Sequence, residues 1–325
     1  MDEKLRIVVS GGGTGGHIFP AVSIANAIKA KHPDAEILFV GALGRMEMER
    51  VPQAGYEIVG LPVRGLIRPL WSPKNVGVLI DFLRSKHKVR KVLKDFRPMA
   101  AVGVGGYASA ATLNAAHAMG VPCLIQEQNS YAGVTNKVLA SGADKICVAY
   151  DGMERFFPAD KIIKTGNPVR QSLIESTISV EDARKSFGLD PEKKTVVFVG
   201  GSLGARTVNE SILRHLDLVE QAKDIQFIWQ TGKYYNASIN KEIEGKKPGN
   251  LLVTDFISDM GAAYKAADLV ISRAGASSIS EFCLIGKPVV LVPSPNVAED
   301  HQTKNAMALV NKDAAIYVKD ADAPE

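Results

Sequence analysis

Two glycine-rich segments of this sequence combine residue types and positions that suit the binding of phosphate groups. The first, residues 11–17 (Gly-Gly-Gly-Thr-Gly-Gly-His), follows a strand-like run at 5–10, and the second, residues 200–205, follows another at 195–199. Helical patterning comes after each segment, which predicts a strand, a turn and a helix N-terminus. The unpaired backbone N–H groups and positive dipole end of a helix bind phosphate. The sequence therefore predicts two nucleotide-type α/β domains.

A third glycine cluster, Gly103-Val104-Gly105-Gly106-Tyr107, follows a further strand-like run in the first half. Glycines at strand ends also serve tight turns that bind nothing, so any one cluster is weak evidence for a site. Three clusters at the carboxyl ends of parallel strands favour a ligand site, because open α/β sheets bind ligands at that edge.

The first loop also fits the spacing of a dinucleotide-binding fingerprint, with Gly11, Gly13 and Gly16. That fingerprint needs an Asp or Glu at the end of the second strand to hold a ribose hydroxyl. Here the predicted second strand, residues 36–40, is followed by Gly-Ala-Leu-Gly and no carboxylate. The pattern therefore disfavours a redox cofactor.

Strand-like runs alternate with helix-length segments, which predicts an α/β fold with parallel sheets covered on both faces. The turn signal Gly166-Asn167-Pro168 interrupts the pattern, and we place the domain boundary there, giving domains at residues 1–167 and 168–325. Strands are expected at 5–10, 36–40, 100–103, 122–126, 145–148, 162–165, 195–199, 226–230, 251–253, 269–272, 289–292 and 315–318, and helices include 18–31, 205–216, 260–266, 277–284 and 301–311.

The composition indicates a folded protein with a basic first half. The chain has 325 residues, 46% of them hydrophobic, and its 3 cysteines show no metal or disulfide spacing, so we expect reduced core thiols. The first residues lack a signal-peptide pattern, and no apolar run approaches the roughly 20 residues of a membrane span. Residues 1–170 carry a net charge of +8 (22 Lys and Arg, 14 Asp and Glu), and residues 171–325 carry −4. The first half is the candidate for contact with an anionic surface.

Five motifs occur in an order and spacing that together are highly specific. They are Gly-Gly-Thr-Gly-Gly-His at 12–17, Gln-Glu-Gln-Asn at 126–129, Gly-Asn-Pro-Val-Arg at 166–170, Gly-Gly-Ser-Leu-Gly-Ala at 200–205, and Arg-Ala-Gly-Ala at 273–276 with Glu281. In these motifs nearly the whole chain resembles the MurG family of peptidoglycan glycosyltransferases (family 28). The resemblance implies a GT-B architecture, in which two Rossmann-like domains with parallel sheets face an interdomain cleft. It also implies inverting transfer of N-acetylglucosamine from UDP-GlcNAc to the C4 hydroxyl of the MurNAc of lipid I, which gives lipid II for peptidoglycan synthesis.

The resemblance places the UDP-sugar donor mainly on the second domain. Ser202 would contact the donor diphosphate at a helix N-terminus, Ile257 would meet uracil through its backbone, and Glu281 would accept hydrogen bonds from the ribose hydroxyls. From the residues alone, a helix cap at Ser202 and surface salt bridges at Arg170 and Glu281 remain alternatives. The full implied donor set is Thr14, Gly15, Gly16, Asn129, Arg170, Ser202, Ile257, Arg273, Ala276, Ser277, Ser278, Ile279, Ser280, Glu281 and Gln302.

His17 is the expected catalytic base, because the acceptor hydroxyl must lose its proton and histidine titrates near neutral pH. Its alternative role is to orient the acceptor diphosphate, and Glu127 is the other candidate base. The stretch after Tyr107 lacks the Ser-Gly-Pro ending usual in the family. The implied acceptor set is Gly13, His17, Gly105, Gly106 and Tyr107.

No metal and no other cofactor is expected, since helix dipoles and arginines can stabilise the leaving diphosphate. Asp320 and Asp322 match a metal-binding Asp-x-Asp pattern only formally. The expected partners are UDP-GlcNAc, lipid I and an anionic membrane surface, with no nucleic acid; association with other cell-wall enzymes is compatible with this role.

A lipid-linked acceptor requires contact with a membrane, and one segment has suitable residues for it. Apolar residues beside a basic cluster favour shallow insertion into an anionic bilayer, with a solvated helix face as the alternative. The expected location is peripheral, on the cytoplasmic face of the bacterial inner membrane. The candidate membrane residues are Leu66, Ile67, Leu70, Trp71, Leu79, Phe82, Arg84, Lys88 and Lys91.

Two other functions share parts of this pattern. A UDP-N-acetylglucosamine 2-epimerase has the same two-domain plan and needs no lipid acceptor, and a nucleotide-sugar-binding scaffold would keep the loops without turnover. We also expect the second domain to be truncated at its C-terminal end, because the strand-like run at 315–318 is followed by no closing helix.

Overall fold

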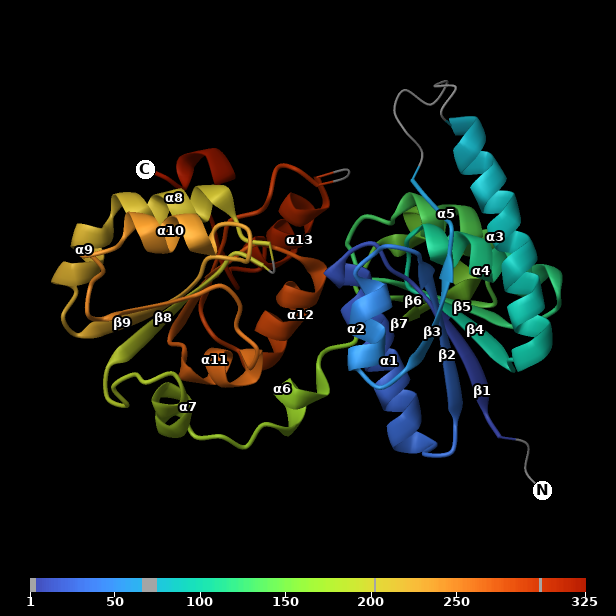
Figure 1. Cartoon of the computed structure of the whole chain (residues 1–325), viewed down its shortest axis with the longest axis horizontal. Helices are drawn as coiled ribbons and strands as arrows, with labels where there is room; N and C mark the ends of the chain where they lie inside the picture. The colour runs from blue at the N-terminus through green and yellow to red at the C-terminus, as the bar shows by residue number, and fades with distance from the viewer. Residues whose placement is uncertain (1–3, 66–74, 202, 298–299) are drawn as a thin grey trace. The chain divides into compact units, whose positions relative to one another are not determined.

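The computed structural model describes residues 4–65, 75–201, 203–297 and 300–325, and the chain forms two compact units, Met1–Val169 and Arg170–Glu325 (Figure 1). Each unit is built on a parallel sheet covered by helices. The expected α/β class with two Rossmann-like domains is thereby confirmed. In the described residues, no helix is both long and apolar enough to cross a membrane.

The first unit contains a seven-stranded sheet in the order β3-β2-β1-β4-β5-β6-β7. Successive side chains of a strand face opposite sides, so Ile7 and Val9 of β1 pack with helices α1 and α2, while Val8 packs with α3 and α4. Because both faces are covered, the strands are almost continuously apolar. The elements are β1 (Arg6–Ser10), α1 (Gly15–Lys31), β2 (Glu36–Ala42), α2 (Glu47–Gln53), β3 (Glu57–Leu61), α3 (Asn75–Phe96), β4 (Ala100–Gly103), α4 (Tyr107–Ala118), β5 (Cys123–Glu127), α5 (Val134–Leu139), the short 3-10 turn η1 (Ala140–Gly142), β6 (Lys145–Val148) and β7 (Ile162–Lys164).

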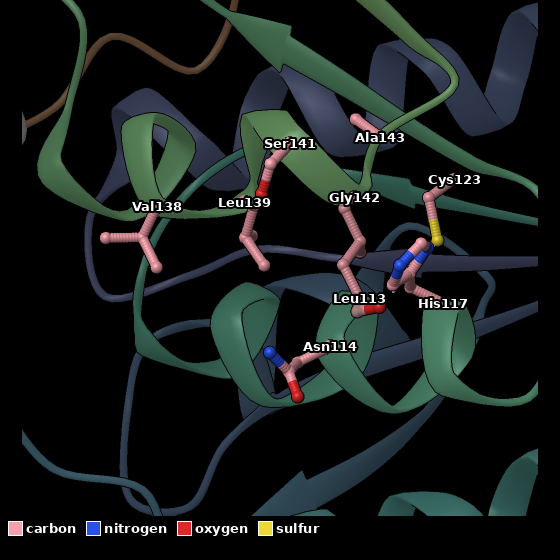
Figure 2. A pocket seen from close by; sticks show the side chains of 9 residues that line it. All are labelled: Leu113, Asn114, His117, Cys123, Val138, Leu139, Ser141, Gly142 and Ala143. Carbon is pink, nitrogen blue, oxygen red and sulfur yellow. Dashed lines mark hydrogen bonds between the residues drawn. The ribbon is translucent and has the colours of Figure 1, made fainter.

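A pocket of about 290 Å³ lies in this unit beside α4, α5 and η1 (Figure 2). His117, in the last turn of α4, and Cys123, at the start of β5, line it. Burial raises the pKa of the Cys123 thiol to about 11, with a further increase from the Asp144 charge, so the thiol is protonated at neutral pH. Since the start of β5 is the amino end of that strand, this pocket lies at the sheet edge opposite the glycine loops.

The second unit contains a six-stranded sheet in the order β10-β9-β8-β11-β12-β13. Its largest buried side chain, Trp229 of β9, packs in a core formed by residues 205–292 and donates a hydrogen bond of 2.9 Å to Asn209 Oδ1. The elements are α6 (Gln171–Glu175), α7 (Val180–Ser186), β8 (Lys194–Val199), α8 (Arg206–Arg214), α9 (Leu216–Gln221), β9 (Ile225–Gln230), α10 (Asn236–Glu242), β10 (Leu251–Thr254), α11 (Met260–Ala266), β11 (Leu269–Ser272), α12 (Ala276–Ile285), β12 (Val289–Leu291), α13 (His301–Val310) and β13 (Ile316–Tyr317).

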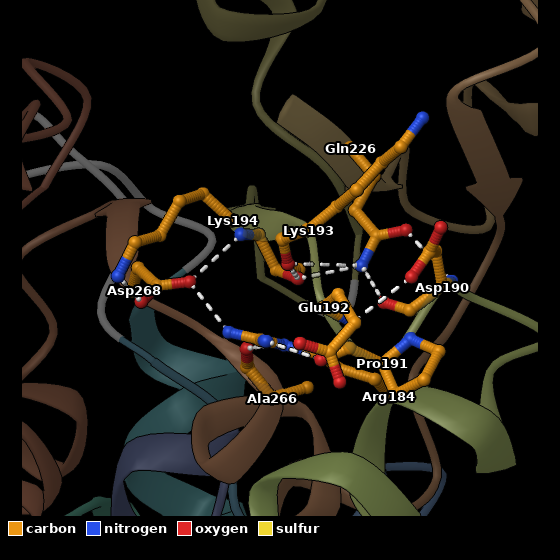
Figure 3. Close-up of polar contacts among 10 residues, drawn as sticks. Arg184, Asp190, Pro191, Glu192, Lys193, Lys194, Gln226, Ala266 and Asp268 are labelled. Atoms are coloured by element: carbon orange, nitrogen blue, oxygen red, sulfur yellow. Dashed lines mark hydrogen bonds and ion pairs between the residues drawn. The ribbon is translucent and has the colours of Figure 1, made fainter. Parts of the chain in front are cut away.

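A polar network around Asp268 fixes the entry to the second sheet (Figure 3). The Asp268 carboxylate accepts hydrogen bonds from the Thr195 backbone N–H at 2.8 Å, from Arg184 at 2.7 Å and from Lys194 at 3.0 Å. Burial alone would raise the pKa of Asp268, but these hydrogen bonds and positive charges together lower it. The network joins α7 to the starts of β8 and β11. It therefore lies at the amino ends of these strands, opposite their carboxyl ends.

Several details differ from the sequence expectations. Strand β3 and helix α2 were not predicted, and the helix expected at 205–216 is divided at His215 into α8 and α9. The three cysteines are free, but Cys283 on α12 is exposed, so the expectation of a core thiol is wrong for that residue.

Candidate active site

The glycine loops after β1 and β4 lie side by side at the carboxyl edge of the first sheet. The two strands are neighbours, with Ser10 opposite Gly103, and they flank the point where the strand order reverses. A Cβ added to Gly106 would lie 2.6 Å from the carbonyl oxygen of Gly12, and the φ of Gly106 is +86°. Only glycine fits this contact, so here the glycine brings the two loops together.

His17 lies where these loops meet. Its Nδ1 is 3.0 Å from the Gly12 carbonyl oxygen and 3.3 Å from Thr14 Oγ1. Since a carbonyl only accepts, we assign the proton of the neutral ring to Nδ1. Nε2 then holds the lone pair, and a Cβ added to Gly105 would lie 2.9 Å from it. The nitrogen that could act as a base therefore faces the β4–α4 loop.

Two helix N-termini reach this edge. Helix α1 begins at Gly15 and α4 at Tyr107, and neither has an acidic residue in its first turn or a side-chain cap hydrogen bond. The positive end of each dipole is thus not neutralised from within its own helix. Tyr107 is 54% exposed, and a Cβ added to Gly65 would lie 2.6 Å from its hydroxyl oxygen. This arrangement suits an anionic ligand such as a diphosphate.

Glu127 is separately engaged in holding its own loop. It is 1% exposed, and Oε1 accepts hydrogen bonds from the backbone and side-chain nitrogens of Asn129 at 3.0 and 3.2 Å. Oε2 accepts from Gly133 N and Asn136 Nδ2, both at 2.9 Å. With four donors on a buried carboxylate, the geometry favours a role in shaping the 127–136 loop over proton transfer.

Sequence reasoning missed Glu47, a carboxylate with 0% exposure at the start of α2. It accepts backbone hydrogen bonds from Gly13 and Ala42, both at 3.0 Å. The four residues after the predicted strand 36–40 contain no carboxylate, whereas Glu47 folds back onto the end of β2 from the next helix. Gly12 and Gly41 are both too crowded by Glu47 to carry a Cβ, but this crowding exists only in the folded chain.

The second glycine loop follows β8 at the corresponding edge of the second sheet. Gly201 and Gly204 have φ of +84° and +94°, conformations that favour glycine. The Gly204 N–H donates to the Gly201 carbonyl at 3.0 Å, and a Cβ added to Gly232 would lie 2.1 Å from Gly204 N. Ser202 lies outside the described residues. Helix α8 begins directly after this loop, at Arg206.

Glu281 on α12 is the centre of a buried polar cluster. It is 2% exposed, its Oε1 lies 3.0 Å from Arg170 Nε, and its Oε2 accepts a hydrogen bond of 3.1 Å from the Tyr264 hydroxyl. Burial raises the pKa of Glu281, and the Arg170 charge and the Tyr264 hydrogen bond oppose that rise only in part. Burial and the Glu281 charge raise the pKa of Tyr264 well above its usual range, so Tyr264 remains a donor. The alternative of a surface salt bridge is therefore wrong for Glu281, because this carboxylate is buried. It does form an ion pair with Arg170.

Helix α12 begins at Ala276 and follows β11, the strand that neighbours β8 in the sheet. Ser277 Oγ in its first turn is buried and has no hydrogen-bond partner among the described residues. A buried hydroxyl without a partner is costly, so it suits a ligand. Ile257 and Ile279 are each 2% exposed.

Arg273 is not directed toward Glu281. Its guanidinium pairs with Asp320 and donates to the carbonyls of Val292 at 3.0 Å and Pro293 at 3.3 Å. Asp320 thus serves as the partner of an arginine, which gives the Asp-x-Asp pattern a structural role. Gln302 on α13 accepts a hydrogen bond of 2.9 Å from Ser294 N.

Comparisons with known proteins agree with this architecture. The glycosyltransferase family 28 N-terminal domain matches residues 7–148, and the glycosyltransferase family 28 C-terminal domain matches residues 195–325. The chain belongs to glycosyltransferase family 28.

Relatives in this family are similar over almost the whole chain. The proteins named UDP-N-acetylglucosamine–N-acetylmuramyl-(pentapeptide) pyrophosphoryl-undecaprenol N-acetylglucosamine transferase from Bacteroides fragilis and Phocaeicola vulgatus are 67% and 68% identical, over 99% and 100% of this chain and 84% and 86% of theirs. The crystal structure of Acinetobacter baumannii MurG has a TM-score of 0.74 at 28% identity, covering 98% of this chain and 86% of that chain. A UDP-GlcNAc 2-epimerase from Neisseria meningitidis shares the fold alone, with a TM-score of 0.66 at 14% identity over 99% of this chain and 90% of that one.

Among the candidate membrane residues of this family 28 chain, Leu66, Ile67, Leu70 and Trp71 lie outside the described residues. On α3, Leu79 is 58% exposed, and Arg84 and Lys91 are exposed. Phe82 is partly buried and packs against the core of the first unit. Lys88 Nζ donates a hydrogen bond of 2.8 Å to the Gly60 carbonyl. The apolar side chains that α3 exposes, here called the α3 stripe, are Val76, Leu79, Ile80 and Leu83.

Proposed function

We propose that this chain transfers N-acetylglucosamine from UDP-GlcNAc to the C4 hydroxyl of the MurNAc of lipid I, with inversion, to give lipid II. The observation that carries the proposal is the 67–68% identity to named transferases of this reaction over almost the whole chain. The glycine loops and helix N-termini at the carboxyl edge of each sheet support it independently, because both substrates contain a diphosphate.

The second unit binds the donor in this proposal. The N-terminus of α8 and the loop containing Ser202 hold the diphosphate, and Glu281 accepts hydrogen bonds from the ribose hydroxyls. Support comes from the buried hydroxyl of Ser277, since a ligand would supply the partner it lacks. Ile257 contacts uracil through its backbone, and the residues of the α12 first turn, Ala276, Ser278, Ile279 and Ser280, line the same place. Arg170 adds positive charge beside Glu281.

Arg273 and Gln302 are the least supported members of the donor set. In this structure Arg273 is paired with Asp320, and the Gln302 side chain holds the Ser294 backbone. Both would have to change partners to touch the donor.

The first unit binds the acceptor and removes its proton. The N-termini of α1 and α4, with Gly13, Gly105, Gly106 and Tyr107, hold the acceptor diphosphate. His17 Nε2 accepts the proton of the attacking hydroxyl, while the Nδ1–H bond to Gly12 keeps the ring in the required tautomer. Thr14, Gly15, Gly16 and Asn129 lie on the same edge and contact the transferred sugar. The departing UDP diphosphate is stabilised by helix dipoles, so the proposal requires no metal.

The chain works at the cytoplasmic face of the inner membrane in this proposal, as a peripheral protein. Support comes from the α3 stripe, whose members lie at i, i+3, i+4 and i+7 and so share one face of the helix. Basic residues follow along α3, including Arg84, Lys91 and Lys94, which suits an anionic bilayer.

The test is transfer of labelled N-acetylglucosamine from UDP-GlcNAc to a lipid I analogue, with EDTA present. We expect product from the wild type and a decrease in kcat of about 100-fold or more for His17→Ala, the usual loss when a general base is removed. UDP binding measured by calorimetry should not change in that variant. His117→Ala is the matched control, because His117 is an exposed histidine of the same unit at the opposite sheet edge.

Other outcomes would contradict the proposal. Conversion of UDP-GlcNAc to its 2-epimer without transfer would favour the epimerase, and UDP-GlcNAc binding without turnover would favour the scaffold. Equal activity of His17→Ala and His117→Ala would remove His17 as the base.

A further inference from the structure

Glu47 is a charged side chain enclosed completely within the first unit. Its exposure is 0%, and no Lys, Arg or His forms an ion pair with it among the described residues. Burying a carboxylate without strong hydrogen bonds is costly. The groups that hydrogen-bond to Glu47 therefore indicate the role of a carboxylate at this position.

The partners of Glu47 are backbone groups of two loops. Oε2 accepts the N–H of Gly13 at 3.0 Å, and Oε1 accepts the N–H of Ala42 at 3.0 Å. A Cβ on Gly12 would lie 2.0 Å from Oε1, and one on Gly41 would lie 2.6 Å from Cγ. One side chain thus ties the β1–α1 loop to the end of β2.

The contact continues from Glu47 to His17 within one short loop. Gly13 gives its N–H to Glu47, and the preceding residue, Gly12, accepts the Nδ1–H of His17 through its carbonyl. These two groups belong to the same peptide unit, whose plane is rigid. Holding the Gly13 N–H in place therefore also fixes the direction of the carbonyl that orients the imidazole.

We propose that Glu47 is a positioning residue for acceptor use: it fixes the Gly12–Gly13 peptide, and through it the orientation of His17 and the backbone that meets the acceptor. This inference rests on the proposed function, in which His17 is the base. Glu47 itself does not touch substrate. Glutamine should not replace it, because an amide has one oxygen, and its NH₂ would face a backbone N–H where the carboxylate accepts a bond.

The test compares kinetic constants for the two substrates separately. In Glu47→Gln, we expect kcat/KM for the lipid I analogue to fall by at least 10-fold, while the KM for UDP-GlcNAc stays within 2-fold of wild type. Gly41→Ala is the second variant. Its added methyl group would lie 2.6 Å from Glu47 Cγ and 2.9 Å from Ile58 Cδ1, and no atom of the acceptor loop is among its three nearest neighbours. It should therefore displace Glu47 from the β2 side and produce the same selective loss even if Glu47→Gln does not fold.

Asp268→Asn is the matched control for general destabilisation. Asp268 also accepts a backbone N–H, but at the far end of the second sheet, so this variant should lose stability without any selective loss toward the acceptor. Acceptor kcat/KM within 2-fold of wild type in both Glu47→Gln and Gly41→Ala would overturn the proposal. A rise in the KM for UDP-GlcNAc as large as the loss in acceptor kcat/KM, as in a merely destabilised protein, would overturn it as well.

Hydrogen exchange distinguishes this inference from the proposed function. Deuterium uptake of peptides covering residues 11–17 should be at least 10-fold faster in Glu47→Gln than in wild type, whether or not the protein transfers sugar. If the wild type makes no lipid II, the proposed function fails, and unchanged uptake in this peptide then overturns the role of Glu47 too. If the wild type is active and uptake is unchanged, only the Glu47 inference fails.

Discussion

Glu281 is held in a place where its ionised form is costly. It is 2% exposed, and burial raises the pKa of its carboxyl above the ordinary value despite Arg170 and Tyr264. The folded state therefore holds this proton more tightly than the unfolded chain. The stability cost of ionisation is absent below the unfolded pKa of about 4.3 and complete above the folded pKa. Perturbed carboxyls of this kind are typical of ligand sites.

Glu281→Gln should therefore become more stable relative to wild type as the pH rises from 4 to 7, because glutamine does not ionise. The quantity to measure is the difference in free energy of unfolding between variant and wild type, from urea denaturation at several pH values. Affinity for UDP should fall roughly 10- to 100-fold in calorimetry, the effect of losing a hydrogen bond to a charged group.

Glu192→Gln is the control for this experiment, because Glu192 is an exposed carboxyl of the same unit. Its stability difference from wild type shows what replacing a carboxylate by an amide on this unit does by itself over the same pH range. A flat difference for Glu281→Gln would mean that Glu281 ionises in the folded protein as easily as in the unfolded chain.

Two buried carboxylates of the first unit, Glu127 and Glu47, show how much of the site could be predicted from the sequence. Glu127 was recognised from its motif, yet its role as an anchor depends on four donors, which the loop from 127 to 136 brings together only when folded. Glu47 belongs to no motif that suggests chemistry. Its importance comes from contacts across 34 residues of sequence, and no local pattern encodes such a contact.

At the scale of elements, hydrophobic patterning was sufficient for most strands. The expected strands at 100–103, 145–148 and 269–272 have the observed bounds, because buried parallel strands are short apolar runs with clear ends. Strand β3 was missed because its sequence, Glu-Ile-Val-Gly-Leu, contains a glycine and a charge, and it lies at the edge of the sheet. The break at His215 was missed because both α8 and α9 continue a helical pattern.

For helix α3, the sequence predicted the helix but not which of its faces packs against the core. Periodicity indicated a helix with apolar and basic residues, but Phe82 faces the core while Val76, Ile80 and Leu83 join Leu79 outside. Which apolar side faces inward is set by tertiary packing, and a helix with apolar residues on both sides leaves this open.

The α3 stripe leads to a prediction about membrane binding. Leu79→Glu with Leu83→Glu should reduce partition to vesicles containing anionic lipid by roughly 10- to 100-fold, since the loss of two exposed leucines that would insert and the added negative charge both oppose insertion. The measurement is sedimentation with vesicles, and transfer to a water-soluble acceptor should be retained. Leu218→Glu with Leu284→Glu changes two leucines that are 56% and 48% exposed on the second unit and should bind vesicles like wild type. Equal binding by both double variants would remove the α3 stripe from the membrane contact.

At the scale of the whole molecule, the core clusters of the two units share no residues in the part of the chain that the structure describes. Core clusters of the first unit lie within residues 5–162, and the core cluster of the second within residues 196–323. Separate cores predict that a ligand bound by one unit stabilises that unit first. The two tryptophans offer a way to observe this, because Trp229 has 0% exposure in the second unit and Trp71 is the other tryptophan of the sequence.

In a Trp71→Phe variant, fluorescence reports on Trp229 and hence on unfolding of the second unit, while far-UV circular dichroism reports on both units. UDP at 100 times its Kd should stabilise the second unit by about 2.7 kcal/mol, and the fluorescence transition in urea should move accordingly. The first unit binds no UDP in the proposed function, so the part of the dichroism change that comes from this unit should keep its urea midpoint. The transitions followed by fluorescence and by dichroism should then no longer coincide. If both probes shift together by the same amount, the units unfold as one cooperative structure, and the separate cores do not act as separate folding units.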